Sequence, residues 1–144
     1  MTHPALDRLV RAGQLKAEPH NDTEIQRMLT LARTRLDDAG LAAVSVEGRF
    51  TSAYNAAHAA ALAALRWHGY RSETRYIVFQ CLTHTVGWPV QRWRVLDVAH
   101  RKRNLAEYEG YLEVEESTVD ELCALVSKLI SDVEALVGRR AAGS

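Results

Sequence analysis

Residues 50–69 read FTSAYNAAHAAALAALRWHG, and this stretch decides the fold class of the chain. Apolar side chains recur in it at intervals of three and four residues, from Phe50 through Tyr54 to Leu65, which is the spacing of one face of a helix. Most positions on that face are alanines, whose small side chains let a neighbouring helix approach closely. The stretch therefore predicts a central helix in an all-α protein.

The same helical periodicity continues through most of the chain, whereas the alternation typical of strands is hard to find. We expect one domain over residues 1–144, with an N-terminal arm carrying a short helix (1–20), a helical bundle (21–138) and a flexible tail (139–144). Short connections between the helices favour an antiparallel four- or five-helix bundle. The predicted helices cover residues 4–13, 21–40, 50–69, 72–87, 89–110 and 117–138.

The composition is that of a globular protein, because 47% of the 144 residues are hydrophobic and 25% are charged. Lys and Arg total 18, as do Asp and Glu, so no net charge points to a nucleic acid or a membrane. The longest apolar run, residues 59–65, is far shorter than the roughly 18–20 residues that span a bilayer. The N-terminus has no apolar core of the signal-peptide kind, and two cysteines match a reducing compartment. We expect a cytoplasmic protein without membrane contact.

The balanced total conceals a charge asymmetry along the chain. Residues 66–103 carry eight basic and two acidic side chains, and residues 104–134 carry nine acidic side chains and one basic one. The basic segment can meet a phosphate backbone, for which Arg94, Arg101 and Lys102 are the candidate nucleic-acid-binding residues, while the acidic segment can meet a second copy. Alternatively, the two segments neutralise each other within the fold.

The predicted helix at residues 89–110 has two kinds of surface. At 100° per residue, an arc of about 140° carries mainly polar and aromatic side chains; it comprises Trp93, Leu96, Asp97, His100, Arg103, Asn104, Glu107, Tyr108 and Tyr111. A stripe of small apolar groups lies nearly opposite; it comprises Val95, Val98, Ala99, Leu105 and Ala106. The pattern predicts a helix covered on both sides, with its polar arc facing a cleft or a second subunit.

Two segments of the chain resemble the HEPN domains of bacteria. They are RKRNLAEYEGY at residues 101–111 and YNAAHAAALAALRWHGYR at residues 54–71, and the resemblance extends over roughly residues 22–137. It implies an all-α antiparallel bundle that dimerises so that the arginine-bearing helices meet at a shared cleft. It also implies a metal-independent endoribonuclease without a cofactor, of the kind often paired as a toxin with a nucleotidyltransferase-type antitoxin.

The family motif is an arginine followed by a polar residue and, four to six residues after the arginine, a histidine. By this resemblance Arg103 matches the arginine, Asn104 the polar residue, and Tyr108 stands at the histidine position. This is a departure, because histidine titrates near neutral pH and can shuttle protons, whereas an unperturbed tyrosine has a pKa of about 10 and is a poor base. The tyrosine that some family toxins carry two residues after the histidine is also displaced, to Tyr111. The expected activity is that of a weak or degenerate endoribonuclease.

Three other interpretations of these residues stay open. Arg103 can form an ordinary pair with Glu107 one turn later, and His100 can replace the missing histidine or serve as a hydrogen-bonded interface residue. The whole domain can instead be a non-catalytic helical module that pairs with a nucleotidyltransferase-like partner. A metal-binding bundle is the third; four histidines are its candidate ligands, although none of the usual ligand spacings occurs. They are His58, His68, His84 and His100.

Overall fold

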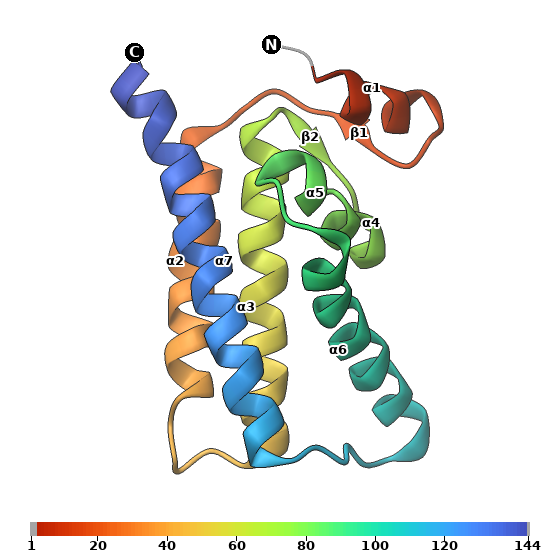
Figure 1. The fold of residues 1–144 in the computed structure, drawn as a ribbon, viewed down its shortest axis with the longest axis vertical. Helices are drawn as coiled ribbons and strands as arrows, with labels where there is room; N and C mark the ends of the chain where they lie inside the picture. The colour runs from red at the N-terminus through yellow and green to blue at the C-terminus, as the bar shows by residue number, and fades with distance from the viewer. Residues whose placement is uncertain (1–2, 144) are drawn as a thin grey trace.

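The computed structural model of the protein describes residues 3–143, and these are mostly helical, as expected of an all-α protein. Helices α2 (Asp22–Ala39), α3 (Val46–Trp67) and α7 (Glu116–Gly143) form the main body. Figure 1 shows α3 lying between the other elements and antiparallel to α2. Both α2 and α7 pack against α3. The helices can approach closely because α3 turns a row of buried alanines toward them.

Polar side chains cap the first turns of α2 and α3. The Asn21 side chain accepts a hydrogen bond from the Glu24 backbone N–H at 3.0 Å and caps α2. Ser45 caps α3 in the same way through the Gly48 N–H, so this helix begins at Val46, one turn before the predicted start at Phe50. Helix α1 spans Pro4–Arg11.

Three local predictions differ from the structure. Strands β1 (Lys16–Ala17) and β2 (Tyr70–Arg71) pair antiparallel; two residues per strand are too few to show an alternating pattern. The helix predicted over 72–87 is divided at Cys81 into α4 (Arg75–Gln80) and α5 (Leu82–Thr85). Helix α7 continues to Gly143, past the predicted end at Gly138, because glycine lowers helix stability by only about 1 kcal/mol.

A buried ion-pair network ties the N-terminal arm to the end of α3. The side chain of Arg66 is 1% exposed and pairs with Glu24 at 2.5 Å and Glu18 at 3.4 Å. It also donates to the backbone oxygens of Glu18 and Pro19. Arg71 pairs with the same two carboxylates. Two arginines of the basic segment therefore have their charge neutralised within the fold, but by Glu18 of the N-terminal arm and Glu24 of α2 rather than by the acidic segment 104–134.

Helix α6 (Val90–Glu109) positions most of the candidate functional residues. Its first half packs on α4 and α3 and buries Trp93, Leu96 and Ala99. Toward its C-terminus α6 diverges from α3 and α7 (Figure 1), and Gly110 ends it with a left-handed φ of 81°, a conformation that glycine adopts without strain. None of the helices in the described residues is long and apolar enough to cross a membrane.

Candidate functional site

A chain of hydrogen bonds links α3, α4 and α6 at the middle of the polar arc. The Tyr54 hydroxyl, on α3, lies 2.8 Å from Nδ1 of His100, on α6. Nε2 of the same histidine lies 3.2 Å from Nδ2 of Asn104, one turn later. Arg75, on α4, donates to the Tyr54 hydroxyl at 2.9 Å. The predicted site residue Asn104 is therefore held in place through His100 and Tyr54.

Two guanidinium groups converge on the ring of Tyr54. The guanidinium carbon of Arg75 lies 5.3 Å from the ring centroid and that of Arg103 lies 6.0 Å from it. Arg103 pairs with Glu107 at 2.9 Å, which confirms the ordinary contact that the spacing predicted. Its Nε, however, is buried without a hydrogen-bond partner in the described part of the chain. A buried N–H without a partner costs free energy, so this arginine has a donor available for an added acceptor.

Burial favours the uncharged forms of the histidines and the tyrosine in this cluster. Burial lowers the pKa of His100; the positive charges of Arg75 and Arg103 act in the same direction, against the opposing effect of Asp97. Burial raises the pKa of Tyr54, with the hydrogen bond from Arg75 opposing that rise. Burial lowers the pKa of His58, the next histidine along α3, to about 4. A neutral imidazole and a protonated phenol thus lie between two arginines near neutral pH.

The structure does not bring Tyr108 to this cluster. Its side chain is 90% exposed, and it makes no hydrogen bond with any other described residue. Tyr108 and Arg103 are about 140° apart around the helix, since each residue advances it by 100°. Arg103 and Tyr108, matched to the arginine and the histidine of the family motif, therefore point in different directions within one chain.

The apolar stripe of α6 is exposed, which corrects the prediction that both sides of this helix are covered. Val98 is 53% exposed and Leu105 is 54% exposed, with Val95 similar, and only Ala99 among the stripe is buried. Instead, the inner half of the polar arc faces α3 and α4, where Asp97 is buried beside Trp93 and Leu96. Three large apolar side chains at one helix face thus have no cover in the single chain.

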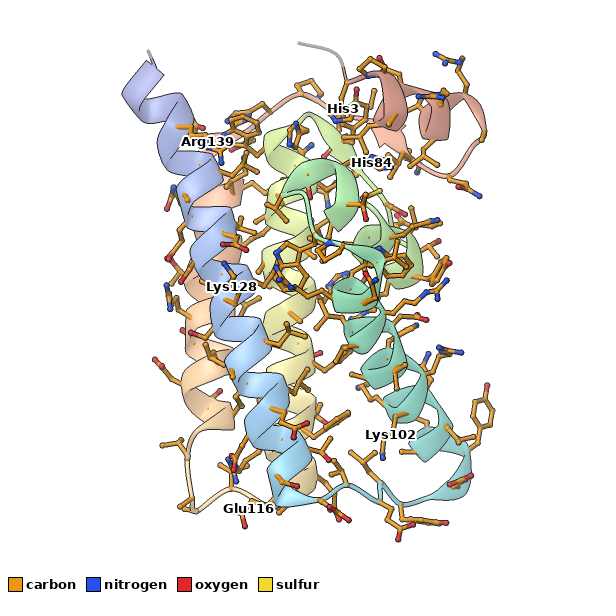
Figure 2. The ribbon with its side chains drawn as sticks, viewed as in Figure 1. His3, His84, Lys102, Glu116, Lys128 and Arg139 are labelled. Atoms are coloured by element: carbon orange, nitrogen blue, oxygen red, sulfur yellow. The ribbon has the colours of Figure 1, made fainter. Side chains whose placement is uncertain are left out.

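The candidate nucleic-acid-binding residues lie on the same outer side as this stripe. Arg94, Arg101 and Lys102 are all exposed, and they fall within about 100° of one another on the helix. Arg101 pairs with Asp97 at 3.3 Å, whereas Arg94 and Lys102 form no ion pair with the described residues. Figure 2 shows Lys102 on the lower half of α6. These three residues are therefore available at the surface but separated from inward-facing Arg103.

A groove of about 510 Å³ lies between α6 and the segment that follows it. Its lining combines apolar side chains with both signs of charge; it comprises Val98, Arg101, Lys102, Leu105, Ala106, Glu109, Tyr111, Leu112 and Glu113. This groove lies on the stripe side of α6, away from the Tyr54 cluster. The polar cluster and the hollow surface are therefore two separate features of the same helix.

The histidines considered as metal ligands are dispersed. His58 and His100 lie near Tyr54. At the opposite end, His3 contacts His68 and His84 with ring centroids 5.7 and 5.8 Å apart, and Figure 2 shows His3 and His84 together beside α1. Among the described residues, no group of three or more His, Cys, Asp or Glu side chains is arranged to hold a metal ion.

Sequence reasoning missed two members of the cluster, Tyr54 and Arg75. The sequence pattern places Tyr54 on the apolar face of its helix, although a single tyrosine among alanines is the one position there with a polar group to satisfy. Arg75 is, by sequence, only one of the eight basic residues of the segment 66–103. Tyr54 contacts His100 across 46 residues of sequence, and Arg75 contacts Tyr54 across 21, which helical spacing cannot indicate.

Comparison of the chain with models of protein families, with curated proteins and with solved structures finds no match.

Proposed function

We propose that this chain is a HEPN-like domain that forms a homodimer and binds RNA or a nucleotide at the face of α6 that carries Arg103. The observation that carries the proposal is the buried, unpartnered Nε of Arg103 next to Asn104 and Tyr54. A guanidinium presents several N–H donors in a planar fork that suits phosphate oxygens. In this proposal Arg103 contacts the phosphate and Asn104 donates from its amide to the same group or to the ribose.

The exposed apolar stripe of α6 supports the proposal that a second copy of the chain packs against this face. An isologous contact between two α6 helices around a two-fold axis near Leu105 places Arg101 of one protomer opposite Glu109 of the other. Basic residues precede this point on the chain and acidic residues follow it, so an antiparallel pair brings opposite charges together. Burial of Val98 and Leu105 in the same contact removes apolar surface from water.

The geometry supports weak catalysis or none. Tyr108 is 90% exposed and forms no hydrogen bond with the other described residues that would orient it toward Arg103. His100 is the nearby group suited to proton transfer, but both of its ring nitrogens already have hydrogen-bond partners. General acid–base help, typically worth about 10²–10⁴-fold in rate, is therefore poorly supplied, and the proposed activity is that of a degenerate endoribonuclease.

A second function is favoured by the groove beside α6. Its apolar lining and its charges of both signs suit a protein surface better than a uniformly charged RNA backbone. In this alternative the domain is a non-catalytic module, and a nucleotidyltransferase-like partner covers Val98 and Leu105.

The two functions are separated by mapping where RNA binds. ¹⁵N-labelled protein is titrated with a single-stranded RNA oligonucleotide, and amide shifts are followed along the chain. The proposed function predicts the largest shifts at residues 100–108. No shift at saturating RNA, or shifts confined to α1 and α2, would overturn it and favour the protein-interaction module.

A further inference from the structure

Arg75 has a position that the RNA-binding proposal does not explain. It extends from α4 to the Tyr54 hydroxyl, and no carboxylate of the described residues lies within ion-pair distance of it. The two distances to the Tyr54 ring place the guanidinium carbons of Arg75 and Arg103 within about 11 Å of each other. Both guanidinium groups therefore border the same tyrosine ring, and movement of the two long side chains can bring them to one small oxyanion.

The charges of Arg75 and Arg103 both act on the imidazole of His100. Arg75 and Arg103 disfavour protonation of His100, and Asp97 favours it. The titratable and charged groups that surround this histidine come from three helices: Tyr54 and His58 of α3, Arg75 of α4, and Asp97, Arg101, Arg103 and Glu107 of α6. Because Asp97 is paired with Arg101 and Glu107 with Arg103, Arg75 is the positive charge here without a carboxylate partner.

We infer that Arg75 and Arg103 form the two halves of one phosphate site, and that His100 takes up a proton when the phosphate binds. This inference rests on the proposed function, since it identifies the group of the nucleotide or RNA that the site holds. The negative charge of the ligand offsets the repulsion that the two guanidinium groups exert on the imidazolium. Ligand and proton therefore bind together.

Asn104 supplies the structural link between proton uptake and ligand contact. Its Nδ2 faces Nε2 of His100, an arrangement that satisfies only an unprotonated Nε2, because an amide nitrogen donates and does not accept. When Nε2 gains a proton it needs an acceptor, which the amide provides by rotating its oxygen toward the ring. The same rotation turns the NH₂ group away from His100, where it can donate to the bound phosphate.

The test follows the His100 ring signal by NMR, with the signal assigned by its loss in His100→Gln. The titration midpoint of His100 is measured with and without sulfate at constant ionic strength, since sulfate is an oxyanion that does not itself titrate between pH 5 and 8. We expect sulfate to raise the midpoint by about one pH unit or more, the effect of a nearby opposite charge. An unchanged midpoint at saturating sulfate would overturn the inference.

Variants and ligands then locate the site. Arg75→Gln is expected to abolish the sulfate response, Arg75→Lys to retain part of it, and Arg27→Gln, a change at an exposed position of α2, to leave it intact. An undiminished response in Arg75→Gln contradicts the two-arginine site. AMP carries a terminal phosphate, and a dinucleotide without terminal phosphates carries only an internal phosphodiester, so the two ligands show which kind of phosphate the site binds. If neither raises the titration midpoint of His100, the phosphate assignment is refuted.

Failure of this inference is distinguishable from failure of the proposed function. RNA that shifts residues 100–108 equally in wild type and Arg75→Gln leaves RNA binding in place and removes Arg75 from the site. If the protein binds no RNA but sulfate still raises the His100 midpoint in an Arg75-dependent way, the phosphate site stands and RNA is refuted as its ligand.

Discussion

The Tyr54 hydroxyl and His100 Nδ1 lie 2.8 Å apart, and their rings stack with an interplanar angle of 19°. This contact joins the alanine-rich helix at the centre of the bundle to the helix that carries Arg103 and Asn104. It fixes one face of α6 against the protein and leaves the other face, with Val98 and Leu105, to the outside. The polar site and the exposed apolar stripe are therefore consequences of one packing arrangement.

The stripe predicts how the chain assembles. Wild type is expected to be a dimer at tens of micromolar protein, and Leu105→Glu is expected to be a monomer, because it places charges of the same sign near the two-fold axis. Leu105 is 54% exposed, so the change should alter the stability of the single chain by no more than about 0.5 kcal/mol. Light scattering measures the mass.

Leu31→Glu is the matched control, since Leu31 is a similarly exposed leucine on α2. A monomeric wild type, or a dimer that survives Leu105→Glu, contradicts the interface.

His58 predicts a loss of stability in mild acid. Burial lowers its pKa in the folded protein to about 4, while the unfolded chain takes up the proton near pH 6.5. The unfolded state therefore binds more protons below pH 6.5, and the free energy of unfolding falls by up to about 1.4 kcal/mol per pH unit from this group. Urea unfolding between pH 7 and 5, above the range of most carboxylates, measures the slope.

His58→Leu tests whether His58 causes this pH dependence of the free energy of unfolding. The variant removes the titrating group and keeps an apolar side chain beside Phe79. We expect a shallower pH dependence in this variant. The lowered pKa values of His68, His84 and His100 leave a residual slope. If the slope is the same in wild type and His58→Leu, His58 is not protonated on unfolding as described.

Tyr108 predicts the outcome of restoring the family residue. A tyrosine accepts a proton from a ribose 2′-hydroxyl far less readily than a histidine, so wild type is expected to cleave RNA slowly or undetectably at neutral pH. Tyr108→His should raise metal-independent cleavage, measured with a labelled RNA in the presence of EDTA. Tyr108→Phe serves as the control. Fast cleavage by wild type that Tyr108→Phe leaves unchanged would show that Tyr108 has no part in the chemistry, and His100 would be the next residue to replace.

The long helices could be predicted from the sequence because their signals are local. Asn21 lies three residues before Glu24, and the apolar period of α3 extends over several turns. The strand pair at Lys16–Ala17 and Tyr70–Arg71 could not be predicted, since it depends on two segments that meet only after α2 and α3 have packed. The break at Cys81 also lacks a local signal, because neither glycine nor proline stands there.

The candidate site could be predicted in part for the same reason. Arg103, Asn104 and His100 share a face through their spacing along α6, and the Arg103–Glu107 pair follows from spacing as well. Tyr54 and Arg75 come from other helices, so their place at the site depends on tertiary packing. The charge of the basic segment was also a misleading signal in part, since Arg66 and Arg71 pair with Glu18 of the N-terminal arm and Glu24 of α2.

The central claim is that Arg103 binds the phosphate of RNA, and the most direct test is RNA affinity as a function of salt in wild type and Arg103→Gln. We expect wild-type affinity to fall steeply as salt rises, because phosphate contacts release counterions. Arg103→Gln should weaken binding by about 1–3 kcal/mol and reduce the salt slope by about one, while Arg27→Gln leaves both unchanged. Affinity that is independent of salt, or equal in wild type and Arg103→Gln, would contradict the account.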